Sequence, residues 1–148
     1  DRADYLPRIY NVQRNSELRD WFVAKFGAAC NAMSTKKEEH ENRLVARAQS
    51  YIQEHYKRDL SLDEVSRQLD LSPYYFSKLF KEETGSNFVE YVTGLRITRA
   101  KELLAGDDCS IKEICAEVGY SDPNYFSRIF KRNAGGMTPT EYRERVRG

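Results

Sequence analysis

The chain has few of the residues that cross-link a protein, bind metal ions or interrupt helices. It contains three cysteines, two histidines and four prolines among 148 residues. The cysteine count is odd, no CxxC pair occurs, and two histidines are too few to complete a zinc-ligand pattern. We therefore expect reduced thiols, no metal site and no bound cofactor.

Long apolar runs are also missing from the sequence. No segment approaches the roughly 18 consecutive apolar residues of a membrane-spanning helix. The first residues, Asp1 to Asp4, lack the apolar region of a signal peptide. Since the chain does not begin with Met, we expect it to be a piece of a longer protein, so the missing targeting signal says little about that protein. The expected reduced thiols indicate the cytoplasm.

The charge is nearly balanced, with a formal net charge of +1. Hydrophobic residues make up 40% of the chain and charged residues 32%, which is typical of a globular domain and not of a disordered segment. Domains that bind nucleic acids are usually strongly basic. A prediction of DNA binding must therefore come from how the residues are arranged.

An internal repeat is the most informative pattern in the chain. The segment 61–81 recurs at 110–131, with an offset of 49 in its first half and 50 in its second half. The extra residue falls in Ser121–Pro123, a turn, where an insertion costs least. The matching positions of the first copy are Leu62, Val65, Leu69, Ser72, Tyr75, Phe76, Ser77, Leu79, Phe80 and Lys81.

Each copy is predicted to form two short helices with a tight break between them. Ser61 and Ser110 begin the first helices and are each followed three residues later by glutamate, the pattern of a capping box. The breaks fall at Asp70 and Gly119, residue types that tolerate a left-handed backbone. The second helices begin with prolines, Pro73 and Pro123, inside the first turn. Helix, short turn and helix is the helix-turn-helix pattern.

A small residue recurs inside the first helix of each copy, where the two helices cross. Ser66 and Cys115 occupy matching positions. We interpret Cys115 as a packing residue and not as a redox group.

The second helix of each copy has one apolar and one polar face. Phe76, Leu79 and Phe80, with their counterparts Phe126, Ile129 and Phe130, are predicted core residues. The polar face can bind bases and phosphates, because Arg and Lys reach guanine or phosphate and Asn pairs with adenine. A single such face could equally be a solvated surface, but two copies favour DNA. Its residues are Tyr74, Ser77, Lys78 and Lys81, and then Asn124, Ser127, Arg128, Lys131 and Arg132.

A longer helix is predicted between the copies. Gly85 ends the preceding helix, and Asn87 with Glu90 forms a capping box at the start of the new one. A helix from Phe88 to Leu104 would be about 25 Å long. Together with two small helical units, this roughly matches the ~34 Å between successive major grooves. Arg96 and Arg99 on this helix are either phosphate contacts or surface charges.

These residues together resemble the AraC/XylS family of bacterial transcription regulators, from about Leu44 to Arg143. The resemblance depends on both copies, on Arg96 with Ala100, and on the closing Thr-Pro-x-Glu-Tyr-Arg motif. It implies an all-α fold of two helix-turn-helix (homeodomain-like) subdomains joined by a linker helix. It also implies that the second helix of each subdomain enters one of two adjacent major grooves. Base contacts would fall on Tyr74, Ser77, Lys78, Pro123, Asn124, Ser127 and Arg128, although Pro123 has no useful donor.

The chain departs from the family pattern at one place, Gly135–Met137, which holds one residue more than usual. We expect a looser loop there, with Thr138 still capping the last helix through Glu141.

The segment before the match is predicted to be a helical extension. Leu18, Trp21, Phe22 and Phe26 form an apolar stripe that starts near Ser16, and a second helix is expected to begin at Thr35. The stripe could pack on the first subdomain, mediate dimerisation or belong to a signalling connection. We expect residues 1–40 to be this extension, 41–86 the first subdomain, 87–105 the linker helix and 106–148 the second subdomain.

The expected function is sequence-specific binding of double-stranded DNA as the output domain of a regulator that activates transcription. The approach to the first subdomain resembles YesN-type response regulators, which implies a missing N-terminal receiver or sensor domain. RNA polymerase and a second copy, joined through the parent protein, are expected partners.

Two other functions are compatible with parts of the sequence. A helical protein-interaction module would show no salt-dependent affinity for DNA. An enzyme with a reactive thiol at Cys109 is disfavoured, because Asp107 and Asp108 would raise the pKa of that thiol. The sequence also lacks a Ser/His/Asp set and a phosphate loop. We therefore expect that the protein is not an enzyme.

Overall fold

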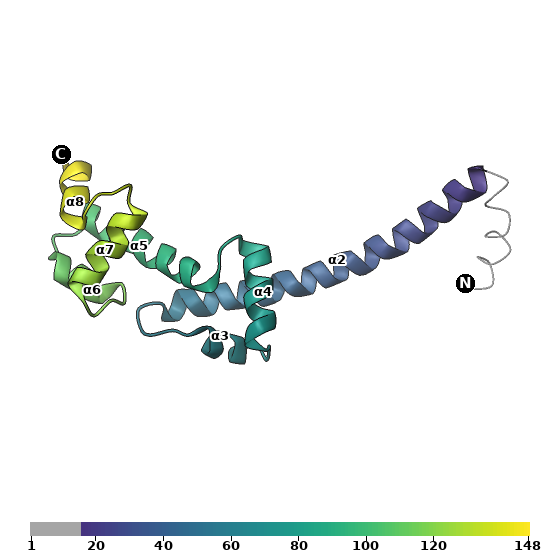
Figure 1. The fold of residues 1–148 in the computed structure, drawn as a ribbon, viewed down its shortest axis with the longest axis horizontal. Coiled ribbons are helices and arrows are strands. Elements are labelled where there is room, and N and C mark those ends of the chain that lie inside the picture. Colours follow the sequence, from purple (N-terminus) through teal and green to yellow (C-terminus); the bar gives the residue numbers. More distant parts are fainter. Residues whose placement is uncertain (1–15) are drawn as a thin grey trace. The chain divides into compact units, whose positions relative to one another are not determined.

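The computed structural model describes the backbone of residues 16–148 and the side chains of residues 35–148. Regular structure in this range is entirely helical, which confirms the all-α prediction (Figure 1). None of these helices is both long enough and apolar enough to cross a membrane. The helices are α2 (Ser16–His55), α3 (Leu62–Gln68), α4 (Pro73–Thr84), α5 (Phe88–Gly106), α6 (Ile111–Glu117), α7 (Pro123–Asn133) and α8 (Pro139–Arg147).

The chain divides into two compact units, Asp1–Arg43 and Leu44–Gly148. The predicted helix start at Thr35 is wrong, because α2 continues through that position. No glycine or proline occurs between residues 28 and 54, and the Lys37–Glu41 pair, 3.8 Å apart, supports the continuous helix. The predicted apolar stripe at residues 18–26 lies outside the described side chains.

The second unit contains two lobes, each with its own apolar core. The first lobe comprises the end of α2, then α3, α4 and the N-terminal half of α5. The second lobe comprises the C-terminal half of α5, then α6, α7 and α8, which gather around it in Figure 1. In the first lobe Phe80 packs edge-on against Tyr91, with ring centroids 5.0 Å apart. In the second lobe Phe130 packs edge-on against Tyr142 at 5.6 Å.

Helix α5 belongs to both cores. Its residues Phe88 and Val92 are buried in the first core, and Ile97, Ala100 and Leu104 are buried in the second. The predicted helix is therefore confirmed, but it is not a spacer that stands between two separate bodies. Each half of α5 completes one lobe, so the two lobes are joined by a helix that is part of both cores.

The turns that shape the two helix-turn-helix units have the predicted backbone. Asp70 has a φ of 55° and Gly119 a φ of 103°, and Pro73 and Pro123 open the following helices. The small residues at the helix crossings, Ser66 and Cys115, are both 1% exposed. This burial confirms the packing interpretation of Cys115.

The predicted capping boxes form only in part. The hydroxyls of Ser61 and Ser110 each accept a bond from the backbone N–H three residues on, both at 3.1 Å. Neither glutamate completes the box, and Glu64 instead binds Arg58 and Tyr51. Among the helix starts of residues 44–148, the full reciprocal box is formed only at the start of α5, by Asn87 and Glu90.

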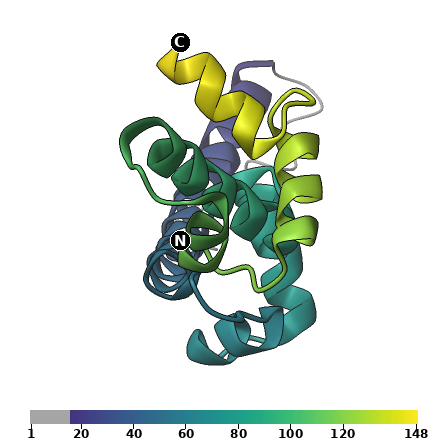
Figure 2. The same cartoon turned by 90° about the vertical axis from the view of Figure 1, so that its left-hand side faces the viewer.

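The extra residue before α8 is absorbed in its loop. Gly135 and Gly136 have φ values of 64° and 87°, which non-glycine residues rarely adopt. Thr138 accepts a bond from the backbone N–H of Glu141 at 3.2 Å, as predicted. In Figure 2, α8 (yellow) lies against one end of α7 (yellow-green). The second lobe is therefore closed in spite of the longer loop.

Candidate nucleic-acid interface

The second helices of the two helix-turn-helix motifs, α4 and α7, each bury one face and expose the other. Phe76 and Phe80 of α4, and Phe126 and Phe130 of α7, are at most 1% exposed. Leu79 is also buried, whereas Ile129 is only partly buried. The apolar stripe predicted for each helix thus anchors it in its core and leaves the polar residues outside.

The predicted site residues of α4 and α7 lie on these outer faces. Tyr74 is 82% exposed, an unusual exposure for a large aromatic side chain. Tyr74, Ser77, Lys78 and Lys81 line one shallow hollow together with Glu82, so they share a face. On α7, Ser127 and Arg128 lie three and four positions after Asn124 and four and three before Lys131, so these residues share a face by helix geometry. Ser77 and Ser127 are half-buried, and the Lys, Arg and Asn side chains, with Arg132, are exposed.

The cations of these faces have no acidic partner. Among residues 35–148, ion pairs form at Lys37, His55, Lys57, Arg58, Arg99 and Arg147. None involves Lys78, Lys81, Arg128, Lys131 or Arg132. The guanidinium of Arg128 lies 6.0 Å from the ring centroid of Tyr125, a position that restrains it without neutralising it. These five charges are therefore available to an anionic ligand.

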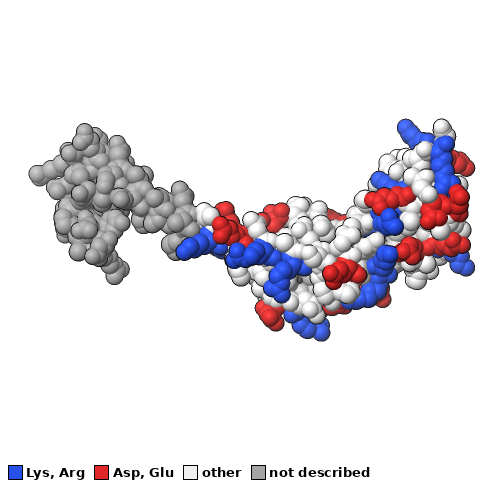
Figure 3. Space-filling model, turned by 180° about the vertical axis from the view of Figure 1, so that it is seen from behind, with Lys and Arg blue, Asp and Glu red and all other residues white. Residues whose placement is uncertain are grey.

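The two faces differ in formal charge. Helix α7 carries Arg128, Lys131 and Arg132 against its capping Asp122, a net charge of +2. Helix α4 carries two lysines against two glutamates, Glu82 and Glu83, a net charge of 0. Figure 3, which views the molecule from behind, shows Lys and Arg interspersed with Asp and Glu over the described residues on that side. The local excess on α7 thus stands out against a nearly neutral chain.

Arg96, the remaining predicted site residue, lies on neither of these faces. Its Nε donates to the carbonyl of Tyr56 and its Nη2 to the carbonyl of Arg58, both at 2.9 Å. Its guanidinium lies 5.0 Å from the ring centroid of Tyr120. Arg99, the other arginine considered on this helix, pairs with Glu102 at 2.9 Å. The structure thus gives Arg96 an intramolecular role that the sequence did not suggest.

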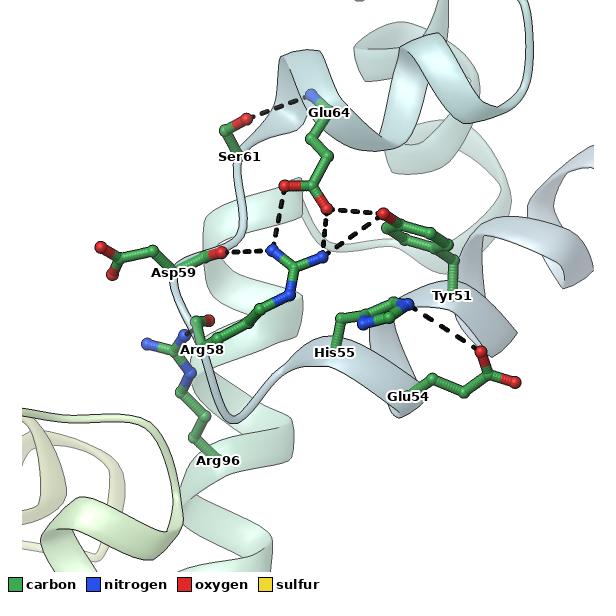
Figure 4. A network of polar contacts seen from close by, with 8 residues as sticks. All are labelled: Tyr51, Glu54, His55, Arg58, Asp59, Ser61, Glu64 and Arg96. Carbon is green, nitrogen blue, oxygen red and sulfur yellow. Dashed lines mark hydrogen bonds and ion pairs between the residues drawn. The ribbon is translucent and has the colours of Figure 1, made fainter.

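A polar network joins the end of α2 to the start of α3, and sequence reasoning missed it (Figure 4). Both carboxylate oxygens of Glu64 accept from Arg58, at 2.5 and 3.0 Å, and Oε2 also accepts from the hydroxyl of Tyr51 at 2.6 Å. These bonds, those of Arg58 first, lower the pKa of Glu64 to about 2. The network fixes the loop whose backbone carbonyls accept hydrogen bonds from Arg96. The only sequence signal was Glu64 itself, which local spacing assigned to a cap.

The thiols of the second lobe are poor nucleophiles. The hydrogen bond of Cys109 to Asp107 is the main reason that the pKa of this thiol is raised, to about 11, in the direction predicted from the neighbouring acids. Burial raises the pKa of the Cys115 thiol, which faces the carbonyl of Tyr120 at 3.4 Å. The part of the chain with described side chains contains no group of three or more His, Cys, Asp or Glu residues that could hold a metal ion.

Comparison with known proteins yields consistent matches. The family model described as helix-turn-helix domain matches residues 65–145. The regulatory protein PocR of Salmonella typhimurium is 39% identical over 107 residues, which are 72% of this chain and 35% of PocR. The chain spans about a third or less of the length of the first curated relatives that it matches.

Two solved structures extend the comparison to the fold. The C-terminal domain of AraT, a response regulator from Geobacillus stearothermophilus, is 40% identical and has a TM-score of 0.66. The match covers 69% of this chain and 84% of that domain. The C-terminal domain of the two-component response regulator yesN from Fusobacterium nucleatum is 37% identical, with a TM-score of 0.62, over 65% of this chain and 93% of that one.

Proposed function

Because this chain belongs to the AraC/XylS family of helix-turn-helix transcription regulators, we propose that it reads two adjacent major grooves of double-stranded DNA, one with α4 and one with α7. The observation that carries this proposal is the repeated face. Two equivalent helices are anchored by buried phenylalanines, and each presents polar side chains and unpaired cations to solvent. A protein that only packed these helices would not need five uncompensated charges there.

The proposed base contacts come from the residues nearest the N-termini of these helices. Tyr74, Ser77 and Lys78 would read the first half-site, and Asn124, Ser127 and Arg128 the second. Asn can pair with adenine and Arg with guanine through two hydrogen bonds each. Pro123 lacks a donor and would contribute shape alone.

Lys81, Lys131 and Arg132 lie farther along their helices and would bind phosphates. Such contacts hold the helix in the groove but carry no direct sequence information. Arg96 is left out of the proposed DNA contacts, because both of its bonds go to the protein backbone.

The longer protein would use this domain as its output. We propose that residues 1–40 connect it to an N-terminal receiver or sensor domain, since the chain is similar to the C-terminal domains of response regulators. Residues 41–86 and 106–148 would form the two DNA-reading subdomains, joined by 87–105. The regulator would act in the cytoplasm by binding and not by catalysis. It would activate transcription by positioning RNA polymerase, with a homodimer formed through the parent protein.

Selection of bound sequences from a random duplex library tests this proposal. We expect an enriched motif with two half-sites about one helical turn, roughly 10 to 10.5 base pairs, apart. Enrichment of a single half-site would contradict the two-groove proposal. An absence of any enriched sequence, together with binding that does not depend on salt, would favour a protein-interaction module.

A salt titration on the selected sequence then tests the asymmetry of the two faces. Affinity falls with salt, and each phosphate contact that is lost makes this fall less steep, by about 0.9 in the slope of log affinity against log salt. Changing Lys131 and Arg132 to Ala should flatten the slope by up to about 1.8. Changing Lys78 and Lys81 to Ala should flatten it less, because Glu82 and Glu83 offset those charges. Equal changes in the two double variants would contradict the proposed asymmetry.

A further inference from the structure

The two lobes meet at a set of contacts that includes none of the residues proposed to face DNA. We name this set the interlobe joint, and it consists of Lys57 from the first lobe, Arg96 from α5, and Glu117, Gly119 and Tyr120 from the second lobe. Lys57 Nζ lies 2.7 Å from Glu117 Oε1. Both groups are about half exposed, and their positions in the chain are 60 residues apart.

Arg96 occupies the centre of the interlobe joint. Its two donated bonds end on the loop after α2, at Tyr56 and Arg58, while its guanidinium faces the ring of Tyr120 in the second lobe. Figure 4 shows Arg96 reaching from α5 to the backbone of Arg58, whose own side chain is held by Glu64. One side chain therefore contacts a fixed loop of the first lobe and the turn of the second.

Gly119 makes the approach of the two lobes possible. A Cβ at this position would lie 2.7 Å from the carbonyl oxygen of Tyr56 and 3.1 Å from Arg96 Nε. The φ of 103° that shapes the second helix-turn-helix also requires glycine. The turn of the second lobe is thus pressed directly against the backbone of the first lobe.

We propose that the interlobe joint fixes the position of α7 relative to α4 and so determines which half-site spacing the protein accepts. This inference rests on the proposed two-groove function. Without the joint, the lobes would be connected through α5 alone, and long helices bend. When two binding modules are linked, the second binding event gains most if the connection holds it at the required distance. Arg96 is therefore a positioning residue, which acts on specificity through the two reading helices.

The test measures affinity for a series of duplexes that carry the selected half-sites. The series contains the preferred spacing, spacings changed by one to several base pairs, and each half-site alone. For Arg96→Ala we expect affinity at the preferred spacing to fall roughly tenfold or more, toward that of the better half-site alone. The penalty for altered spacing should shrink, and affinity for each single half-site should stay the same. Arg96→Lys should be intermediate, because an ammonium group lacks the rigid fork that spans two carbonyls.

Arg99→Ala is the matched control on the same helix. Arg99 is exposed and binds only Glu102 within α5, so its loss should leave the spacing profile unchanged. Retained affinity for single half-sites shows that both lobes of a variant are folded.

The exposed pair of the joint gives a second test that does not depend on Arg96. Lys57→Glu and Glu117→Lys each place like charges at the joint, and each should lower affinity at the preferred spacing roughly two- to fivefold. The double exchange should restore the spacing profile.

If the unchanged protein shows a spacing preference that neither the Arg96 variants nor the charge exchanges alter, this inference is overturned while the proposed function stands. If the unchanged protein selects no sequence, the proposed function fails, and this inference fails with it.

Discussion

Arg96 and Arg143 make corresponding contacts in the two lobes. Each donates its Nε and Nη2 to two backbone carbonyls at or just beyond the C-terminal end of its lobe's first helix. For Arg96 these carbonyls belong to Tyr56 and Arg58. For Arg143 they belong to Leu104 and Asp107, at 3.2 and 3.0 Å. Carbonyls at the end of a helix have no partner within it, so a guanidinium that binds two carbonyls there stabilises the helix end and the residues that follow it.

This correspondence shows that the repeat is longer than the helix-turn-helix alone. Each lobe has four helices, and the fourth sends an arginine back to the end of the first. Helix α5 is the fourth helix of the first lobe and the first helix of the second. Sharing this helix brings the two lobes side by side, where the contacts of the interlobe joint form.

Removal of Arg143 should destabilise the second lobe. We expect Arg143→Ala to lower the free energy of unfolding by about 1 to 2 kcal/mol, since the carbonyl of Leu104 loses a charged donor. The carbonyl of Asp107 keeps a bond from Arg147, which limits the loss. Urea denaturation measures the effect. Arg145→Ala, an exposed change on the same helix, is the control, and equal stability of the two variants would contradict the capping role.

Glu64 should make stability depend on pH in the acid range. Its pKa is about 2 in the folded chain against an ordinary value of 4.5. Because the folded value is the lower one, the unfolded chain binds the proton first as pH falls. The stabilisation is therefore complete above pH 4.5 and is lost progressively toward pH 2.

Thermal melts of the unchanged protein and of Glu64→Gln measure this dependence. The difference in Tm between them should be largest near neutral pH and should shrink as pH falls through that window. Glu83→Gln changes a carboxylate that forms none of the ion pairs in residues 35–148, and it should show no such trend. A Tm difference that stays constant as pH falls to the folded pKa of about 2 would show that the network does not hold Glu64 ionised.

Gly119 and Gly94 should respond in opposite ways to alanine. At Gly119 the positive φ and the 2.7 Å approach to the carbonyl of Tyr56 both oppose a side chain. We expect Gly119→Ala to cost about 2 kcal/mol or more of unfolding free energy. Gly94 lies inside α5, and a Cβ there would meet no atom within 4 Å, so Gly94→Ala should stabilise by about 0.5 to 1 kcal/mol. Urea denaturation measures both changes, and a neutral Gly119→Ala variant would contradict the close approach of the two lobes.

Cys115 should tolerate small residues and reject large ones. It is 1% exposed where α6 crosses α7, and Ser66 occupies the same place in the first lobe. Cys115→Leu should cost about 1 to 3 kcal/mol by overpacking. Cys115→Ala and Cys115→Ser should cost less, as measured by urea denaturation. If serine were as damaging as leucine, the thiol itself and not its volume would be the property that matters.

Arg128 should contribute to sequence discrimination. For Arg128→Ala we expect binding to the selected sequence to weaken by about 1 to 3 kcal/mol, with relaxed preference at one base pair. Quantitative binding to the selected sequence and to its single-base variants measures both effects. Arg145→Ala on α8 is the control. An equal loss on every sequence would mean that Arg128 contacts phosphate and not a base edge.

Features that depend on neighbours in sequence could be predicted well. The starts of α4, α5, α7 and α8 follow from capping residues and prolines within the first turn. The left-handed turns at Asp70 and Gly119 follow from residue types that accept them. The buried phenylalanines of α4 and α7 follow from helical spacing. These features involve residues a few positions apart, so a local pattern is enough to identify them.

Features that depend on distant partners could not be predicted. Glu64 has the spacing of a capping residue, yet Arg58 and Tyr51 offer its carboxylate stronger bonds once α2 and α3 are packed together. From the sequence, Arg96 could be a phosphate contact or a surface charge. Its partners lie 38 and 40 positions away, and nothing in the local sequence distinguishes them from other carbonyls.

The sequence by itself determined the helices after residue 60, their buried faces and the repeat that identifies two helix-turn-helix lobes, because each of these is encoded within one or two helical turns. Tertiary structure alone decided that α5 is shared between two cores and that Arg96 contacts both lobes. A long side chain has many possible partners of similar energy, and only the packed chain selects among them by bringing two carbonyls within hydrogen-bonding distance.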